Sequence, residues 1–166
     1  MSATVTRGLS RFLSAIVVMI SACDVFSVVS APWWLKYAYD KGYGELGFLA
    51  GTPYGDAHPG GSYVFMLIFI MLCGLLMLGL LFEAFRILRN IRRDMPFCRS
   101  NAASFFNAAV YASCLSVVFI FKMFFSPSIL TLLCTGIFIL FALFMLVLSK
   151  LFALAAQIRE ENELTI

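Results

Sequence analysis

The chain has 166 residues, of which 62% are hydrophobic and 13% charged, and its formal net charge at pH 7 is +3. Soluble domains carry roughly 45–50% apolar and about 25% charged residues, so this composition excludes an ordinary soluble domain. The apolar residues fall in four blocks, each long enough for the roughly 20 residues that cross a bilayer as a helix. We therefore predict an all-α integral membrane protein, a single domain folded as a four-transmembrane-helix bundle.

The first predicted span covers residues 10–30. Pro32 follows it and is expected to end the helix, because proline cannot donate a backbone hydrogen bond. Trp33 and Trp34 are typical of the aromatic belt at a membrane interface. Asp24 lies within this span, where an ionised carboxylate costs at least about 2.5 kcal/mol. It is either a packing residue near the outer interface or a functional carboxylate.

The rest of the chain divides into a loop, three spans and a tail. Residues 31–62 are predicted to form the outer loop, which is rich in Gly and Pro and holds the lone histidine, His58. The remaining spans and the tail are predicted at 63–83, 101–124, 128–150 and 151–166. The helical pattern of the second and fourth spans continues beyond the apolar blocks, so we expect both helices to extend into the cytosol.

An elbow at residues 86–101 joins the second and third spans. Pro96 is expected to break the second helix, and Asp94 to cap the third helix with Pro96 in its first turn. The third helix carries small residues at four-residue spacing, which lets helices approach closely in lipid. This packing ridge comprises Ser104, Ala108, Ala112 and Ser116, with Asn107 and Tyr111 beside it as intramembrane polar groups.

The basic residues predict the orientation. Of the 12 Lys and Arg residues, only Lys36, Lys41 and Lys122 fall on the side of the outer loop. Lys122 is close enough to that side to reach the interface by snorkelling. The positive-inside rule therefore places both termini and the elbow in the cytoplasm. We expect a multi-pass protein of the bacterial cytoplasmic membrane in contact with anionic headgroups.

Motifs for catalysis and cofactor binding are missing from the sequence. It has no phosphate-binding Gly-rich loop, no H-E-x-x-H pattern and no C-x-x-C pair. No histidine lies in a predicted span, which excludes histidine ligation of haem there. We therefore predict a protein that is not an enzyme, with no cofactor, no metal site and no direct contact with nucleic acid.

The two predicted cytoplasmic segments have complementary charge. Acidic residues at a helix C-terminus oppose the helix dipole, so we expect the elbow arginines to compensate those of the tail. Anionic lipid headgroups are an alternative partner for the same arginines. The candidate docking residues are Arg86, Arg89, Arg92, Arg93, Pro96, Phe97, Arg99, Asn101, Glu160, Glu161, Glu163, Leu164 and Ile166.

Two short motifs resemble those of a known family. Residues 95–101, Met-Pro-Phe-Cys-Arg-Ser-Asn, are similar to the P-F-x-x-x-N element of a bacterial family of four-span membrane proteins of unknown function. The ending at 160–166 resembles that family's acidic L-T-I terminus. Met95 departs from the pattern, which often has glycine there. Because members are often encoded beside a helix-turn-helix regulator of the Cro/CI type, the resemblance implies a membrane partner of such a regulator.

Three functions follow as hypotheses. The first is a non-enzymatic regulatory or scaffold protein that binds a cytosolic partner, such as a helix-turn-helix transcription regulator. The second is a small transport or immunity protein that uses the outer loop and Asp24 to protect against a toxic compound. The third is an accessory subunit of a larger membrane complex, or a homo-oligomer, that packs through the ridge from Ser104 to Ser116.

Overall fold

The computed structural model describes residues 3–41, 63–92, 98–125 and 128–163, and all of its regular structure is helical. The helices are α1 (Ala3–Lys41), α3 (Tyr63–Arg92), α4 (Arg99–Phe125) and α5 (Ile129–Glu163). Each contains a stretch long and apolar enough to cross a membrane. The 27 residues of α4 span about 40 Å at 1.5 Å per residue, more than the roughly 30 Å of a hydrocarbon core.

Several hydroxyl side chains inside the helices bond within their own helix. Ser14 Oγ donates to the carbonyl of Ser10 at 2.8 Å, and Thr135 Oγ1 donates to the carbonyl of Thr131 at 2.8 Å. Both bonds reach back one helical turn within the same helix. This pattern allows Ser and Thr to lie in apolar helices without a partner on another helix.

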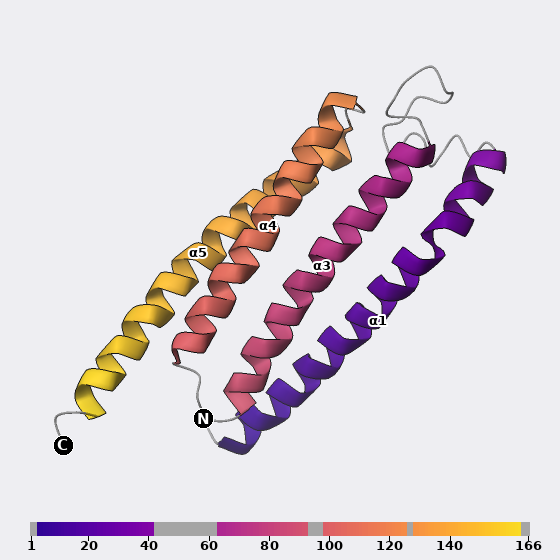
Figure 1. The fold of residues 1–166 in the computed structure, drawn as a ribbon. Helices are drawn as coiled ribbons and strands as arrows, with labels where there is room; N and C mark the ends of the chain where they lie inside the picture. Colours follow the sequence, from indigo (N-terminus) through magenta and orange to yellow (C-terminus); the bar gives the residue numbers. More distant parts are fainter. Residues whose placement is uncertain (1–2, 42–62, 93–97, 126–127, 164–166) are drawn as a thin grey trace.

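The four helices lie side by side in chain order, as Figure 1 shows. Packing joins α1 to α3, α3 to α4, and α4 to α5, while any other pair of described helices makes at most marginal contact. The prediction of a bundle is therefore wrong, because the helices form an open row instead. Consecutive helices pack beside one another, but no substantial contact between α1 and α5 closes the row.

The main apolar core follows α4, which packs on both sides. Its small and apolar side chains that are buried include Ala102, Ala108, Ala109, Ala112 and Leu115. Aromatic rings add contacts to both neighbours: Phe119 lies 5.4 Å from Phe69 of α3 and 5.6 Å from Phe138 of α5, measured between ring centroids. The extensive contact between α4 and α5 makes the last two helices direct neighbours.

Pro32 does not end the first helix, contrary to prediction. It lies inside α1, which continues to Lys41. Proline removes one backbone donor but keeps a helical φ, and packed neighbours in spanning helices can satisfy the local backbone. Here the Tyr63 hydroxyl donates to the Pro32 carbonyl at 3.1 Å, and Ala31 is fully buried at 0% exposure. The rest of the predicted outer loop, with His58, lies outside the described residues.

The elbow also differs from prediction. The Cys98 carbonyl accepts bonds from the amides of Asn101 and Ala102, at 2.9 and 3.4 Å, and α4 begins at Arg99 rather than at Pro96. Asp94 and Pro96 themselves lie outside the described residues. The predicted continuations of the second and fourth helices are confirmed as helix, since α3 runs to Arg92 and α5 to Glu163.

Candidate functional site

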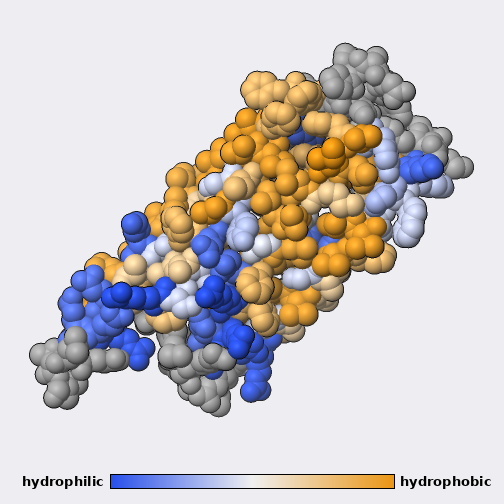
Figure 2. Space-filling view, in the orientation of Figure 1, coloured by the Kyte–Doolittle hydropathy of each residue, from blue (hydrophilic) through white to orange (hydrophobic). Residues whose placement is uncertain are grey.

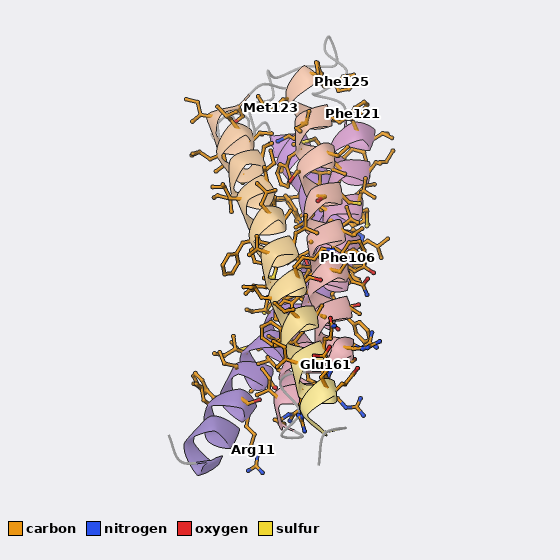
Figure 3. The ribbon with its side chains drawn as sticks, turned by 90° about the vertical axis from the view of Figure 1, so that its left-hand side faces the viewer. Arg11, Phe106, Phe121, Met123, Phe125 and Glu161 are labelled. Atoms are coloured by element: carbon orange, nitrogen blue, oxygen red, sulfur yellow. The ribbon has the colours of Figure 1, made fainter. Side chains whose placement is uncertain are left out.

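Charged side chains gather where α1 begins, α3 ends, α4 begins and α5 ends. In Figure 2 the hydrophilic atoms are concentrated at this end, whereas apolar atoms dominate the middle of the visible face. Figure 3 places Arg11 and Glu161 here, with Phe121, Met123 and Phe125 at the opposite end. We call this region the charged end and define it by Arg86, Arg89, Arg92, Arg99, Glu160 and Glu161.

An ion pair joins α4 to α5 at the charged end. Arg99 Nη2 donates to Glu160 Oε2 at 2.7 Å, so the predicted compensation of the acidic tail by an elbow arginine is confirmed for this pair. The side chains are 75% and 50% exposed, and exposed pairs of this kind contribute about 0–1 kcal/mol. One turn away, Gln157 Nε2 donates to Glu161 Oε1 at 2.9 Å.

Amide side chains join α3 to α4 at the same end. Asn90 Nδ2 donates to Asn101 Oδ1 at 2.7 Å and to Ser100 Oγ at 3.4 Å. Asn101 has 0% exposure, so its predicted place in the elbow is that of a buried link between helices. Asn90 was not among the predicted site residues, although an amide on the inner side of the elbow is the signal that could have identified it.

The arginines of α3 have different surroundings. Arg86 Nη1 lies 4.0 Å from Glu83 Oε2, the Arg92 guanidinium lies 5.9 Å from the Phe85 ring centroid, and Arg89 is exposed. The structure therefore separates the predicted arginines between two helices. The remaining predicted docking positions, Arg93, Pro96, Phe97, Leu164 and Ile166, lie outside the described residues, as does the side chain of Glu163.

Glu83 is a buried acid that sequence reasoning missed. Although it is charged and only three residues before Arg86, it is 5% exposed. Asn107 Nδ2 of α4 donates to Glu83 Oε1 at 2.9 Å, so this polar side chain beside the ridge bonds across helices. Glu83 Oε2 has no hydrogen-bond partner among the described residues. Glu83 and Asn90 lie two helical turns apart on one face of α3, and this spacing is the sequence signal that could have placed Glu83 against α4.

The small-residue ridge of α4 is used inside the chain. Ser104, Ala108, Ala112 and Ser116 are all at most 4% exposed, so the predicted packing role is confirmed. Tyr111 beside the ridge lies against Gly79 of α3, where an added Cβ would come within 2.7 Å of the tyrosine ring. Because the ridge is covered by the chain's own helices, it is not available to a larger complex or a second copy.

Asp24 lies in α1, within the stretch able to cross a membrane. Its Oδ1 would be 3.7 Å from a Cβ added to Gly74 of α3, so the carboxylate is near the packed face between these helices. Its Oδ2 is buried and has no hydrogen-bond partner among the described residues. Asp24 therefore lies in a helix apolar enough to cross a membrane, and the glycine opposite it leaves room for the side chain.

Lys122 is buried, contrary to the prediction that it snorkels to the interface. It is 6% exposed, with Nζ 3.4 Å from Thr131 Oγ1 of α5 and 5.1 Å from the Phe69 ring centroid of α3. The lysine lies on the side of α4 that faces both neighbours, so its four-carbon chain extends into the row. A cation over an aromatic face gains about 2 kcal/mol or more when desolvated.

The described residues contain no cluster of three or more His, Cys, Asp or Glu side chains that could hold a metal ion. The five cysteines are not joined in disulfides.

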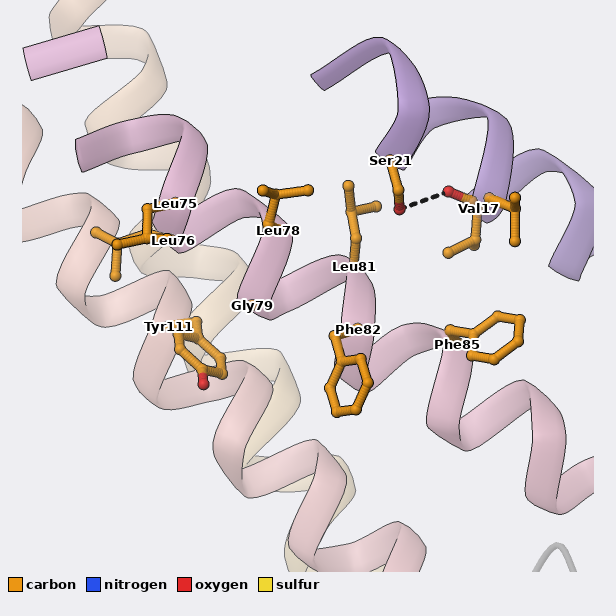
Figure 4. A pocket seen from close by; sticks show the side chains of 11 residues that line it. Val17, Ser21, Leu75, Leu76, Leu78, Gly79, Leu81, Phe82, Phe85 and Tyr111 are labelled. Carbon is orange, nitrogen blue, oxygen red and sulfur yellow. Dashed lines mark hydrogen bonds between the residues drawn. The ribbon is translucent and has the colours of Figure 1, made fainter. Parts of the chain in front are cut away.

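An apolar groove runs along one face of the row. It has a volume of about 710 Å³ and lies between α1 and α4, with α3 as its floor. Val18 and Ser21 line it from α1, Leu75 and Phe82 from α3, and Tyr111 from α4. Figure 4 shows these helices around it, with the Ser21 hydroxyl turned back to the Val17 carbonyl. The interior of the groove therefore offers mainly apolar contacts.

Comparison with known proteins gives a family without an assigned activity. The pattern of the family described as "Protein of unknown function (DUF2975)" matches residues 34–166. The comparison finds no match among curated proteins and none among solved structures. Since the family match covers most of the chain, and four helices are apolar enough to cross a membrane, the protein belongs to the DUF2975 family of unknown function.

Proposed function

We propose that this protein is a non-enzymatic regulatory or scaffold protein of the bacterial cytoplasmic membrane, and that its charged end binds a cytosolic protein. The observation that carries the proposal is the Arg99–Glu160 ion pair, 2.7 Å long. It joins the start of α4 to the end of α5 and presents exposed charges of both signs.

The charged end is suited to protein recognition because its helices are fixed to one another. The Asn90–Asn101 bond of 2.7 Å joins α3 to α4, and extensive packing joins α4 to α5. Rigid placement lowers the entropic cost of binding. Exposed charges of both signs provide orientation and selectivity for a partner with a complementary pattern.

The distribution of basic residues supports a cytoplasmic location for this end. A helix-turn-helix regulator is the partner class that the family resemblance suggests, and the protein would hold it at the membrane. Nucleic acid would then be bound by the partner rather than by this chain.

Site-specific photocrosslinking in intact cells tests the proposal. A photoreactive residue at Arg159, beside the ion pair, is expected to capture a cytosolic protein. The matched control is the same residue at Lys36, an exposed position of α1 that lies toward the opposite end of the row. Removal of residues 160–166 should abolish the adduct while the protein remains in the membrane. An adduct that survives the truncation, or that forms equally at Lys36, would contradict the proposal.

A transport or immunity function is the second candidate, favoured by the unpartnered Oδ2 of Asp24. A buried carboxylate oxygen in a spanning helix is a common feature of substrate and ion pathways. Asp24→Asn preserves the shape of the side chain and removes its charge. If this candidate is correct, the substitution removes protection against the toxic compound, whereas full protection by the variant argues against it.

A further inference from the structure

The face of α3 that lines the apolar groove continues into the charged end. Leu75, Gly79 and Phe82 line the groove, and Arg86 and Arg89 follow them in the sequence at alternating four- and three-residue steps. Residues with this spacing share one face of an α-helix. At 1.5 Å per residue, the two arginines lie about 6 Å and about 10 Å beyond Phe82 along the helix axis.

The α1 wall of the groove follows the same course. Ser21 and Val18 line the groove, and Ser14 and Arg11 continue along that side of α1 at the same spacing. Arg11 is exposed and is at the charged end in Figure 3. Both helices therefore pass from apolar groove walls to basic side chains in the same direction.

The acidic side chains near the end of the groove do not cancel the positive charge of its arginines. Glu83 lies beside Arg86, with 4.0 Å between Oε2 and Nη1, but its side chain is only 6% exposed, whereas that of Arg86 is 47% exposed. Arg89 is exposed as well. The exposed surface at this position is therefore basic, while the groove beyond it is apolar.

We propose that the groove binds one anionic phospholipid, with its headgroup phosphate at Arg86 and Arg89 and an acyl chain along Leu75 and Phe82. The charge complementarity and the apolar continuation match the two parts of such a molecule. The volume of about 710 Å³ is within the range of roughly 300–1,000 Å³ that small-molecule sites have. The lipid site uses Arg86 and Arg89 of the charged end but not the Arg99–Glu160 pair that carries the proposed protein contact, and its test needs no protein partner.

Native mass spectrometry of the full chain tests the site. The protein is reconstituted in nanodiscs that contain equal amounts of phosphatidylglycerol and phosphatidylcholine, and the lipids retained on release are identified. Wild-type protein is expected to retain one phosphatidylglycerol in preference to phosphatidylcholine. Two arginines near an anionic surface together contribute a factor of roughly 30 to the affinity for an anionic lipid. Since Glu83 reduces the contribution of Arg86, we expect the double variant R86Q/R89Q to lose about tenfold in this preference.

Two further variants separate the site from a general charge effect. K150Q/R159Q removes the same charge from exposed positions of α5, outside the groove, and should keep the wild-type preference within about twofold. Val18→Trp fills the groove from an exposed position, 54% accessible, and should release the lipid although both arginines remain. Circular dichroism checks that each variant keeps its helix content.

Three results would overturn the proposal. The first is no phosphatidylglycerol preference in the wild-type protein. The second is an equal loss of phosphatidylglycerol preference in R86Q/R89Q and K150Q/R159Q, which would show that the preference depends on the total charge at this end and not on the groove. The third is a dimer that carries no lipid and dissociates in Val18→Trp, which would assign the groove to a second copy of the chain.

Discussion

Replacement of Asn107 by leucine should destabilise the protein through Glu83. The two side chains join α4 to α3, with Asn107 Nδ2 donating to Glu83 Oε1 at 2.9 Å. Leucine is similar to asparagine in size but has no donor. The substitution therefore removes the hydrogen bond while it largely preserves the packing between these helices.

The expected magnitude depends on which of two effects is larger. Hydrogen bonds to charged groups contribute about 1.5–3 kcal/mol, whereas interhelical bonds in membrane proteins average about 0.6 kcal/mol with a maximum near 1.7. Glu83 is 5% exposed, and its Oε2 already has no hydrogen-bond partner among the described residues. Because water cannot replace the lost donor there, we expect a loss of about 1.5 kcal/mol, near the upper membrane value.

A double-mutant cycle measures this interaction. Unfolding of Asn107→Leu, Glu83→Gln and the double variant is followed by circular dichroism in mixed micelles with increasing sodium dodecyl sulfate. The double variant should lose less than the sum of the single variants, by about 1 kcal/mol. Strictly additive losses would show that the two side chains do not interact in the folded protein, and would refute the assignment of Glu83 to the interface between α3 and α4.

Three other substitutions and reactions test the packing. Gly74→Ala places a Cβ into the Cγ2 atom of Val28 and should cost about 1–3 kcal/mol of stability in the same assay. Gly136→Ala, with no atom within 4 Å of its new Cβ, is the control and should be neutral or stabilising. Equal effects of the two substitutions would contradict the contact between α1 and α3. Arg99→Gln should change stability by less than about 1 kcal/mol, and a larger loss would mean that its exposed ion pair is structural. A water-soluble acylating reagent, with sites identified by mass spectrometry, should modify exposed Lys36 at least about tenfold faster than Lys122, which is 6% exposed. Equal rates would show that the Lys122 side chain instead reaches the interface by snorkelling.

Local features of the sequence correctly predicted several interactions of the candidate site. The four-residue repeat of small side chains indicated the packed face of α4, with Asn107 as a polar group beside it. The acidic tail indicated a basic partner, and the Arg99–Glu160 pair confirms one such contact. Each of these inferences depends on helical periodicity or charge, which a sequence displays directly.

Burial was predicted less well for Glu83 and Lys122. Both are charged and close to the ends of apolar blocks, where an orientation toward water is the ordinary expectation. Their burial depends on partners from other helices: Asn107 for Glu83, and Phe69 with Thr131 for Lys122. Such partners are far apart in the sequence, so only the packing of three helices brings them together.

The sequence by itself determined the four long apolar helices. It did so because a backbone in hydrocarbon must satisfy its own hydrogen bonds, which a helix does within one segment. Only the tertiary structure decided that the helices form an open row, that α1 continues through Pro32, and that an apolar groove forms between α1 and α4. These features depend on the fit of surfaces between helices, which the composition and periodicity of a single helix do not specify.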